Sequence, residues 1–142
     1  MNWRVLIALN SGPLAAHAAG VGIELTRALG AELAFVYVID EPSDIGADGG
    51  VSAREAIKKA KEDGKEFIAA IRQRAPQLVA LEFMPIGLAS AEIVKAAKEW
   101  PASLIVIGSH GRGGIQRAVR GSVAEEVMRH APCPVMVVKA EE

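Results

Sequence analysis

The sequence predicts an α/β fold in which a single doubly wound, parallel five-stranded sheet carries helices on both faces. Short apolar runs rich in β-branched residues alternate with longer amphipathic segments along the whole chain. Such runs are typical of strands that are buried on both faces of a parallel sheet. Hydrophobic residues make up 51% and charged residues 23% of the 142 residues, so we expect one core and one domain, residues 1–142. Right-handed crossovers between the alternating strands and helices then produce the doubly wound arrangement.

The first three elements are a strand, a helix and a strand. Residues 5–9 and residues 33–39 are apolar runs, so we expect each to form a buried strand. Between them, Asn10 or Ser11 provides a helix cap, and Gly30 ends the helix. We expect one face of this helix to pack on the sheet, because apolar residues recur along it at helical spacing: Leu14, Ala18, Val21, Leu25 and Leu29.

A charged helix and a third strand follow. Residues 40–52 contain a proline and several glycines and form the longest predicted loop, and residues 52–74 form an amphipathic helix. Glu55 and Lys59 are four residues apart on its charged face, which is the spacing of a helical ion pair. Residues 78–84 alternate between apolar and polar more than the other strands, which favours a place near the edge of the sheet.

The last third of the chain contains two more strands and two more helices. Ser90 caps a helix that ends near Trp100, and residues 103–107 form the fourth strand. A glycine-rich segment leads into a helix over residues 122–131, and residues 134–139 form the fifth strand. Because this last strand is apolar and the chain ends just after it, we expect it to be an edge of the sheet.

Composition excludes several classes of protein. Sixteen Lys and Arg residues against 17 Asp and Glu residues give a formal net charge of −1, which excludes a strongly basic DNA-coating protein. Aromatic residues make up only 4% of the chain, too few for a base-stacking nucleic-acid platform. Cys133 is the single cysteine, which excludes an internal disulfide framework and a four-cysteine zinc site. We find no apolar run of membrane-spanning length and no signal peptide, so we expect a cytoplasmic protein.

The segment between the fourth strand and the last helix has the features of a phosphate-binding loop. Residues 108–122 read GSHGRGGIQRAVRGS. The glycines let backbone N–H groups approach a ligand closely, and successive N–H groups in a turn form an anion-binding nest. The helix that begins near Ser122 adds free N–H groups and the positive end of its dipole. The segment contains no acidic residue and three positive side chains, Arg112, Arg117 and Arg120.

The common phosphate and catalytic motifs are missing from the sequence. There is no G-x-x-x-x-G-K-[ST] loop, and Gly20-x-Gly22 lacks the third glycine of the dinucleotide fingerprint and lies inside a predicted helix. The H-E-x-x-H, C-x-x-C and G-x-S-x-G motifs are also absent. The glycine-rich segment is therefore a phosphate loop of another type.

At these residues the sequence resembles the universal stress protein family. The nucleotide-binding branch of that family carries G-x₂-G-x₉-G-[ST], and Gly108, Gly111, Gly121 and Ser122 meet every fixed position of the pattern. The resemblance covers nearly the whole chain, including the first strand and the closing segment APCPVMVV. It implies a Rossmann-like sheet with strand order 3-2-1-4-5, in which a ligand binds where the strand order reverses.

The resemblance also implies a set of nucleotide-binding residues. Val38 and Ile107 would line the slot for the adenine. Ala8, Leu9 and Asn10 match the end of the first strand, where the family usually has an aspartate that reaches the base or ribose. Asn10 can donate and accept hydrogen bonds but carries no charge. Residues of the glycine-rich segment would contact the phosphates and ribose: Gly108, His110, Gly111, Arg112, Gly121, Ser122 and Val123.

Several of these residues also have a simpler structural interpretation. Ser122 and Glu125 have the spacing of a capping box, so the Ser122 hydroxyl can cap the last helix without a ligand. His110 can be a turn residue, and the three arginines can be a solvated surface. Asp40, at the end of the second strand, can orient the following loop rather than meet a ligand.

The resemblance implies a homodimeric regulator of the stress response that binds ATP, with Mg²⁺ or Mn²⁺ as the accompanying ion. The homodimer would form by antiparallel pairing of the last strand with its twin, which covers an apolar edge. We expect a binding protein and not an enzyme, because the sequence has no P-loop lysine and no evident general base. Neither nucleic acid nor a membrane is an expected partner. Two alternatives stay open: a slow ATPase or autokinase, and a protein-interaction module without nucleotide binding.

Overall fold

The strands that the structure describes join one parallel sheet. The structure is a computed structural model that describes residues 2–10, 12–41, 52–109 and 122–139. Within these residues the sheet has five strands in the order β3-β2-β1-β4-β5, which confirms the predicted fold class and strand order. The strands are β1 (Arg4–Leu9), β2 (Glu32–Tyr37), β3 (Ala80–Phe83), β4 (Leu104–Gly108) and β5 (Val135–Val138). The helices are α1 (Pro13–Leu29), α2 (Ala53–Arg72), α3 (Ala89–Glu99) and α4 (Ser122–His130).

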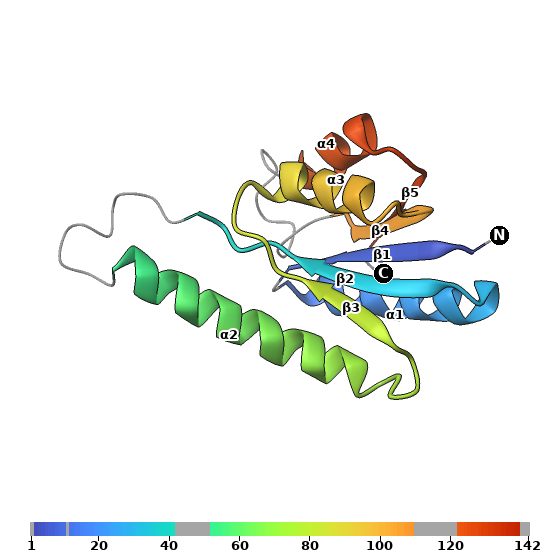
Figure 1. Ribbon diagram of the computed structural model, residues 1–142, viewed down its shortest axis with the longest axis horizontal. Helices are drawn as coiled ribbons and strands as arrows, with labels where there is room; N and C mark the ends of the chain where they lie inside the picture. Colours follow the sequence, from blue (N-terminus) through green and yellow to red (C-terminus); the bar gives the residue numbers. More distant parts are fainter. Residues whose placement is uncertain (1, 11, 42–51, 110–121, 140–142) are drawn as a thin grey trace.

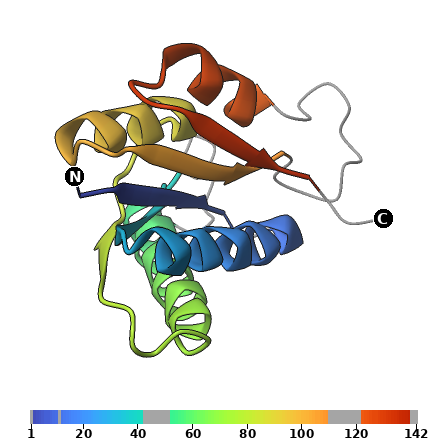
Figure 2. The same cartoon turned by 90° about the vertical axis from the view of Figure 1, so that its right-hand side faces the viewer.

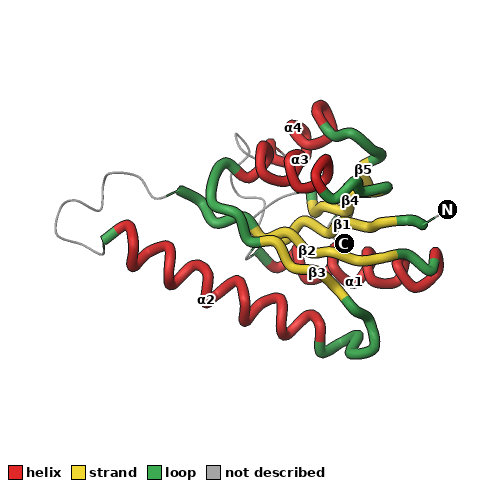
Figure 3. The backbone as a smooth tube through the Cα atoms, viewed as in Figure 1, coloured by secondary structure: helices red, strands yellow, loops and turns green. Residues whose placement is uncertain are grey.

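Helices cover both faces of the sheet in a three-layer arrangement. Helices α1 and α2 pack on one face and α3 and α4 on the other (Figure 1 and Figure 2). Figure 3 shows the strands as a layer between the two pairs of helices. Strand β1 has β2 on one side and β4 on the other, so the strand order reverses next to β1. In the part of the chain that the structure describes, no helix is long and apolar enough to cross a membrane.

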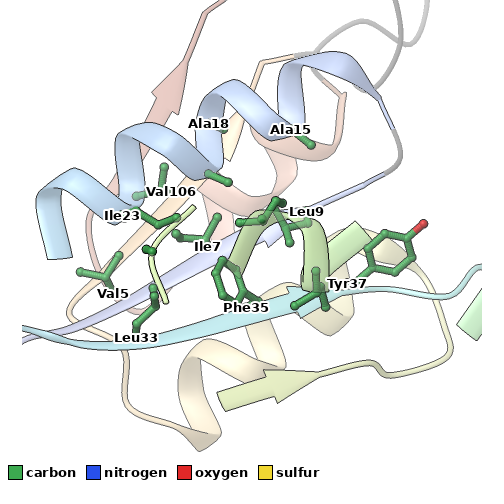
Figure 4. Close-up of a cluster of buried hydrophobic side chains, with 14 of the residues drawn as sticks. Val5, Ile7, Leu9, Ala15, Ala18, Ile23, Leu33, Phe35, Tyr37 and Val106 are labelled. Carbon is green, nitrogen blue, oxygen red and sulfur yellow. The ribbon is translucent and has the colours of Figure 1, made fainter. Parts of the chain in front are cut away.

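Alternate residues of the central strands supply two separate cores. Val5, Ile7 and Leu9 of β1 belong to the core under α1 and α2 (Figure 4). Leu6 and Ala8 of the same strand belong to the core under α3 and α4. The period of two explains why β1 is apolar from Val5 to Leu9, since both of its faces are covered there.

The face of α1 that packs on the sheet differs from the prediction. Most of its buried residues are small: Ala15, Ala18, Ala19, Gly22, Ile23 and Thr26. Val21 and Leu25 are only partly buried, and Leu29 is exposed. A Cβ atom built on Gly22 would lie 2.5 Å from Cδ1 of Ile7, so the helix packs closely on β1. The prediction followed side-chain hydrophobicity, whereas close packing selected small residues.

Two predicted helix caps are also corrected. The N-cap of α1 is Gly12, and Asn10 instead accepts a hydrogen bond from the Gly12 backbone N–H. The N-cap of α3 is Leu88, so Ser90 lies inside the first turn. Gly30 ends α1 as predicted, with a φ of 62° that favours glycine.

The predicted ion pair of α2 does not form, because both side chains have other partners. The Glu55 carboxylate accepts a hydrogen bond from the Ser52 backbone N–H, and the Ser52 hydroxyl accepts one from the Glu55 N–H. This capping box holds Glu55 at the start of the helix. Lys59 pairs instead with Asp63, at 3.5 Å.

Candidate functional site

The carboxyl ends of β1 and β4 lie next to each other. Ala8 of β1 is paired with Val36 of β2 on one side and with Ile107 of β4 on the other. Asn10 and Gly108 lie just beyond these paired residues, which confirms that the strand order brings them to the same edge. Doubly wound sheets bind ligands at such an edge, where the crossovers leave for opposite faces.

Three of the predicted apolar site residues share one face of the sheet at this edge. Ala8 and Ile107 are buried in the core under α3 and α4, and the half-buried Val38 packs against the same core. Leu9 points to the opposite face and is buried in the core under α1 and α2. The side chains of Ala8, Val38 and Ile107 therefore lie on one face of the sheet at this edge, and the Leu9 side chain lies on the other.

Asn10 presents hydrogen-bond donors at the end of β1. Its Oδ1 accepts a hydrogen bond of 2.8 Å from the backbone N–H of Gly12. The side chain is exposed, so its Nδ2 amide group faces solvent and can donate to a ligand. The adjoining helix α1 has no acidic residue in its first turn, and its N-cap makes no side-chain hydrogen bond. The described residues therefore place an uncharged donor and a positive helix end at this point of the edge.

Gly108 has a packing role of its own. A Cβ atom built on Gly108 would lie 3.1 Å from Cγ of Leu14 in α1, which is a tight contact. The next residue, Ser109, donates its backbone N–H to the Val138 carbonyl of β5 at 2.9 Å. The first glycine of the motif thus lets α1 approach the end of β4, independently of any ligand.

Most of the glycine-rich segment lies outside the described residues. His110, Gly111, Arg112 and Gly121 belong to this group, as do the other two arginines of the segment. Ser122 is the first residue of α4, but its side chain is not described, so the capping-box interpretation stays a prediction. Val123, the next residue of α4, is exposed.

Tyr37 is a residue near this edge that the sequence analysis missed. It is the last residue of β2, it is paired with Leu9, and only 8% of it is exposed. Burial raises the pKa of the phenol, and the negative charges of Asp63 and Asp40 raise it further. In Figure 4 its hydroxyl points away from the core. The sequence could have drawn attention to Tyr37, because it is the single tyrosine of the chain and lies three residues before Asp40.

The described residues hold no ready-made metal site. Among residues 2–10, 12–41, 52–109 and 122–139, no group of three or more His, Cys, Asp and Glu side chains is placed to bind an ion. Cys133 is half-buried, and burial raises the pKa of its thiol, which favours the unreactive protonated form.

The fold defines a doubly wound α/β protein in which the strand order reverses between β1 and β4, the place where sheets of this class bind ligands. A family model described as the universal stress protein family matches residues 1–139, and the chain belongs to this family.

Known relatives support the same family. A universal stress protein of Methanocaldococcus jannaschii is 31% identical over 139 residues, which cover 96% of this chain and 81% of the relative. A universal stress protein A homologue of Coxiella burnetii is 31% identical over 117 residues, with 82% and 80% covered.

Solved structures share the fold. The universal stress protein UspA from Lactobacillus plantarum superposes with a TM-score of 0.83 at 22% identity, with 96% of this chain and 97% of that chain covered. A universal stress protein from Archaeoglobus fulgidus in complex with dAMP gives a TM-score of 0.69 at 24% identity, covering 96% and 98%. A universal stress protein in complex with cAMP gives 0.71 at 22% identity, covering 96% of both chains. At these identities the likeness shows the fold alone.

Proposed function

We propose that this universal stress protein binds an adenine nucleotide, ATP, at the edge between β1 and β4 and acts in the cytoplasm as a homodimeric regulator of the stress response. The observation that carries the proposal is the pairing of Ala8 with Ile107, because it places Asn10 and the start of the glycine motif at one edge. Structural neighbours with the same fold are solved with dAMP and with cAMP, which supports an adenine nucleotide as the ligand class.

The described residues fit such a ligand chemically. Ala8, Val38 and Ile107 give an apolar surface suited to one face of the base. Asn10 supplies a donor for a ribose or base acceptor, and the N-terminus of α1 adds a favourable field for an anion. The phosphates would lie on the glycine motif that runs from Gly108 to Ser122.

A divalent ion would reach this site with the nucleotide. Mg²⁺ is commonly held by one or two carboxylates together with substrate phosphates. Asn10 contributes no charge, so we infer that Mg²⁺ or Mn²⁺ would be coordinated mainly by the phosphates of ATP. The ion would neutralise part of their charge beside the sheet.

We further propose that the chain binds ATP without turning it over and that β5 forms the homodimer interface. The described residues that we assign to the site contribute a neutral amide, apolar side chains and helix N–H groups, and none of these is a general base. Strand β5 pairs only with β4 in the described residues, and Met136 on it is exposed. Antiparallel pairing with a second copy would cover this edge.

Mass spectrometry of the ligand released from freshly purified, denatured protein tests the proposal directly, because it identifies a bound nucleotide without assuming one. Titration with ATP and Mg²⁺ should also raise the melting temperature. At about 100 times Kd the stabilisation is about 2.7 kcal/mol, or roughly 10 °C for a domain of this size. Gly121→Val should remove most of the shift, and Gly20→Ala should leave it unchanged. No released nucleotide and no shift at millimolar ATP would contradict nucleotide binding, and sustained ADP production would contradict the binding-only role.

A further inference from the structure

Strand β3 forms the outer edge of the sheet, opposite β5. It pairs with β2 on one side, and within the described residues no strand pairs with its other side (Figure 1). Its backbone therefore presents free N–H and C=O groups along one edge. Natural sheets usually protect such an edge or use it to bind an extended chain.

Exposed apolar side chains concentrate along this edge. Nine large apolar side chains are exposed among the described residues, and four of them lie between residues 79 and 88: Val79, Leu81, Ile86 and Leu88. Val79 is 86% exposed, Leu88 71% and Leu81 50%. Clusters of exposed apolar residues on soluble proteins commonly mark interaction sites.

A groove of about 600 Å³ lies between β3 and α3. Its apolar part includes Leu81, Phe83 and Trp100. The rings of Phe83 and Trp100 pack edge to face, with 6.3 Å between their centroids. The α3 side of the groove carries Glu92, Lys95 and Glu99, spaced so that they follow one face of the helix. The groove thus combines an apolar floor with a charged wall.

The charge of this wall is predominantly negative. Glu92 and Glu99 make no ion pair with any residue that the structure describes, and among those residues Lys95 is the one basic residue that lines the groove. The third carboxylate of the groove, Glu82, is already paired with Arg72 of α2. An occupant with positive side chains would supply the partners that Glu92 and Glu99 lack.

This charge selects among the possible occupants. A second copy that pairs symmetrically through this surface would bring its own Glu92 and Glu99 against this wall, and like charges at an interface are unfavourable. Nucleic acid or an anionic membrane would be repelled in the same way. An extended chain with lysine or arginine at alternate positions fits better, because the aliphatic stems can cover Leu81 while the charged ends reach the carboxylates.

We propose that the β3 edge, together with the groove lined by Leu81, Phe83, Trp100, Glu92 and Glu99, binds an extended cationic segment of a partner protein. The segment adds to the sheet as a strand next to β3, and backbone hydrogen bonds hold it there. Its basic side chains pair with Glu92 and Glu99. This inference does not depend on nucleotide binding, since the groove and the β1–β4 edge use different residues.

The test uses the full chain and a seven-residue peptide that alternates lysine and threonine, blocked at both ends. We expect saturable binding by calorimetry, with chemical-shift changes at the backbone amides of Ala80–Phe83 and an affinity that falls as salt rises. The Glu92→Lys, Glu99→Lys double variant should bind at least tenfold more weakly. The matched control is Glu62→Lys, Glu66→Lys on α2, which changes the net charge equally at exposed positions outside the groove and should bind within twofold of the parent.

Two peptide controls separate charge from strand addition. A peptide with glutamate in place of lysine should not bind, and a peptide methylated at every backbone amide should lose binding because it cannot donate to β3. If the double variant of the groove unfolds by circular dichroism, Glu92→Gln, Glu99→Gln replaces it, with at least a threefold loss expected. The proposal would be overturned if the methylated or the acidic peptide bound as tightly as the lysine–threonine peptide. It would also be overturned if the groove variant and the α2 control variant lost affinity equally, or if the parent did not bind the peptide at millimolar concentration. Self-association that Leu81→Lys abolishes would overturn it as well.

Discussion

Gly22 of α1 lies directly against Ile7 of β1, so closely that a Cβ atom on Gly22 would be 2.5 Å from Cδ1 and 2.7 Å from Cγ1 of Ile7. Ile7 is fully buried beneath the helix (Figure 4), so its side chain has little room to move aside. This contact sets how near α1 can come to the strand that leads to Asn10. The position of the α1 N-terminus at the candidate site therefore depends on Gly22, in the middle of the helix, having no side chain.

Gly22→Ala should lower the free energy of unfolding by about 1–2 kcal/mol, because overpacking a tight core outweighs the gain in helix propensity. Gly20→Ala is the matched control. A Cβ at Gly20 meets nothing within 4 Å, so this variant should gain about 0.5–1 kcal/mol. Urea unfolding of the three proteins measures both changes. Equal effects of the two substitutions would contradict the close packing.

Asn10→Ala should cost about 1 kcal/mol of unfolding free energy in the protein without ligand. The substitution removes the oxygen that accepts the 2.8 Å hydrogen bond from the Gly12 N–H, just before α1 begins. Gly12 itself is buried, so its N–H would lose its partner in a poorly solvated place. Asn2→Ala, at an exposed position, should change stability by less than about 0.5 kcal/mol. Thermal unfolding of both variants checks the difference, and equal stabilities would refute it.

Stability should fall at alkaline pH through Tyr37. Its pKa in the folded protein is raised above the ordinary value of about 10 by burial, Asp63 and Asp40. The unfolded chain therefore loses the phenolic proton first as the pH rises, and the folded state binds more protons. This contribution to stability is complete below the ordinary pKa and is lost as the pH passes through the raised one.

Two variants isolate the effect of Tyr37. Tyr37→Phe should show a smaller loss of unfolding free energy above pH 10 than the parent. Because Tyr37 is the single tyrosine, phenolate absorbance of the parent reports its titration directly. Asp63→Asn should move that titration to lower pH by removing a negative charge. An unchanged titration in Asp63→Asn would show that the carboxylate does not act on the phenol.

Met136→Lys should weaken the proposed homodimer, since a lysine on an edge strand opposes pairing with another strand. Met128→Lys on α4 is the control, because it places the same charge on another exposed methionine, which lies outside β5. Sedimentation velocity should show a shift toward monomer at micromolar concentration for Met136→Lys alone. A parent protein that is monomeric at high concentration, or identical behaviour of the two variants, would count against the β5 interface.

Local patterns were sufficient for the elements and their order. The short apolar runs with β-branched residues indicated strands covered on both faces. Glycine at position 30 ended α1, because its φ of 62° disfavours other residues. The alternating pattern at residues 78–84 correctly placed β3 at an edge, because only a partly covered strand can carry Glu82 outward. The spacing of the glycine motif indicated the family that the comparison then confirmed.

Other features depended on contacts between segments that are distant in the sequence. The face of α1 that packs on the sheet was decided by the short distance between α1 and β1, which favours small residues. The hydrophobic pattern along the helix does not contain this distance. Two further errors were local: the Glu55 carboxylate accepts a hydrogen bond from the Ser52 backbone instead of pairing with Lys59. Ser90 lies inside the first turn of α3, two residues after the N-cap Leu88. Tyr37 was not identified from the sequence, because its burial depends on packing between elements and one of its two acidic neighbours, Asp63, lies on α2.

By itself the sequence determined the fold class, because hydrophobic periodicity and right-handed crossovers leave few alternatives. Its resemblance to the universal stress protein family implied the strand order, and with it the edge at which Asn10 and Gly108 meet. Only the tertiary structure decided which atoms are available there. The Asn10 side-chain oxygen accepts a hydrogen bond from the Gly12 N–H, and Leu14 lies against Gly108. A groove remains between α3 and β3. These outcomes depend on distances of a few tenths of an ångström between packed elements, which a one-dimensional pattern does not contain.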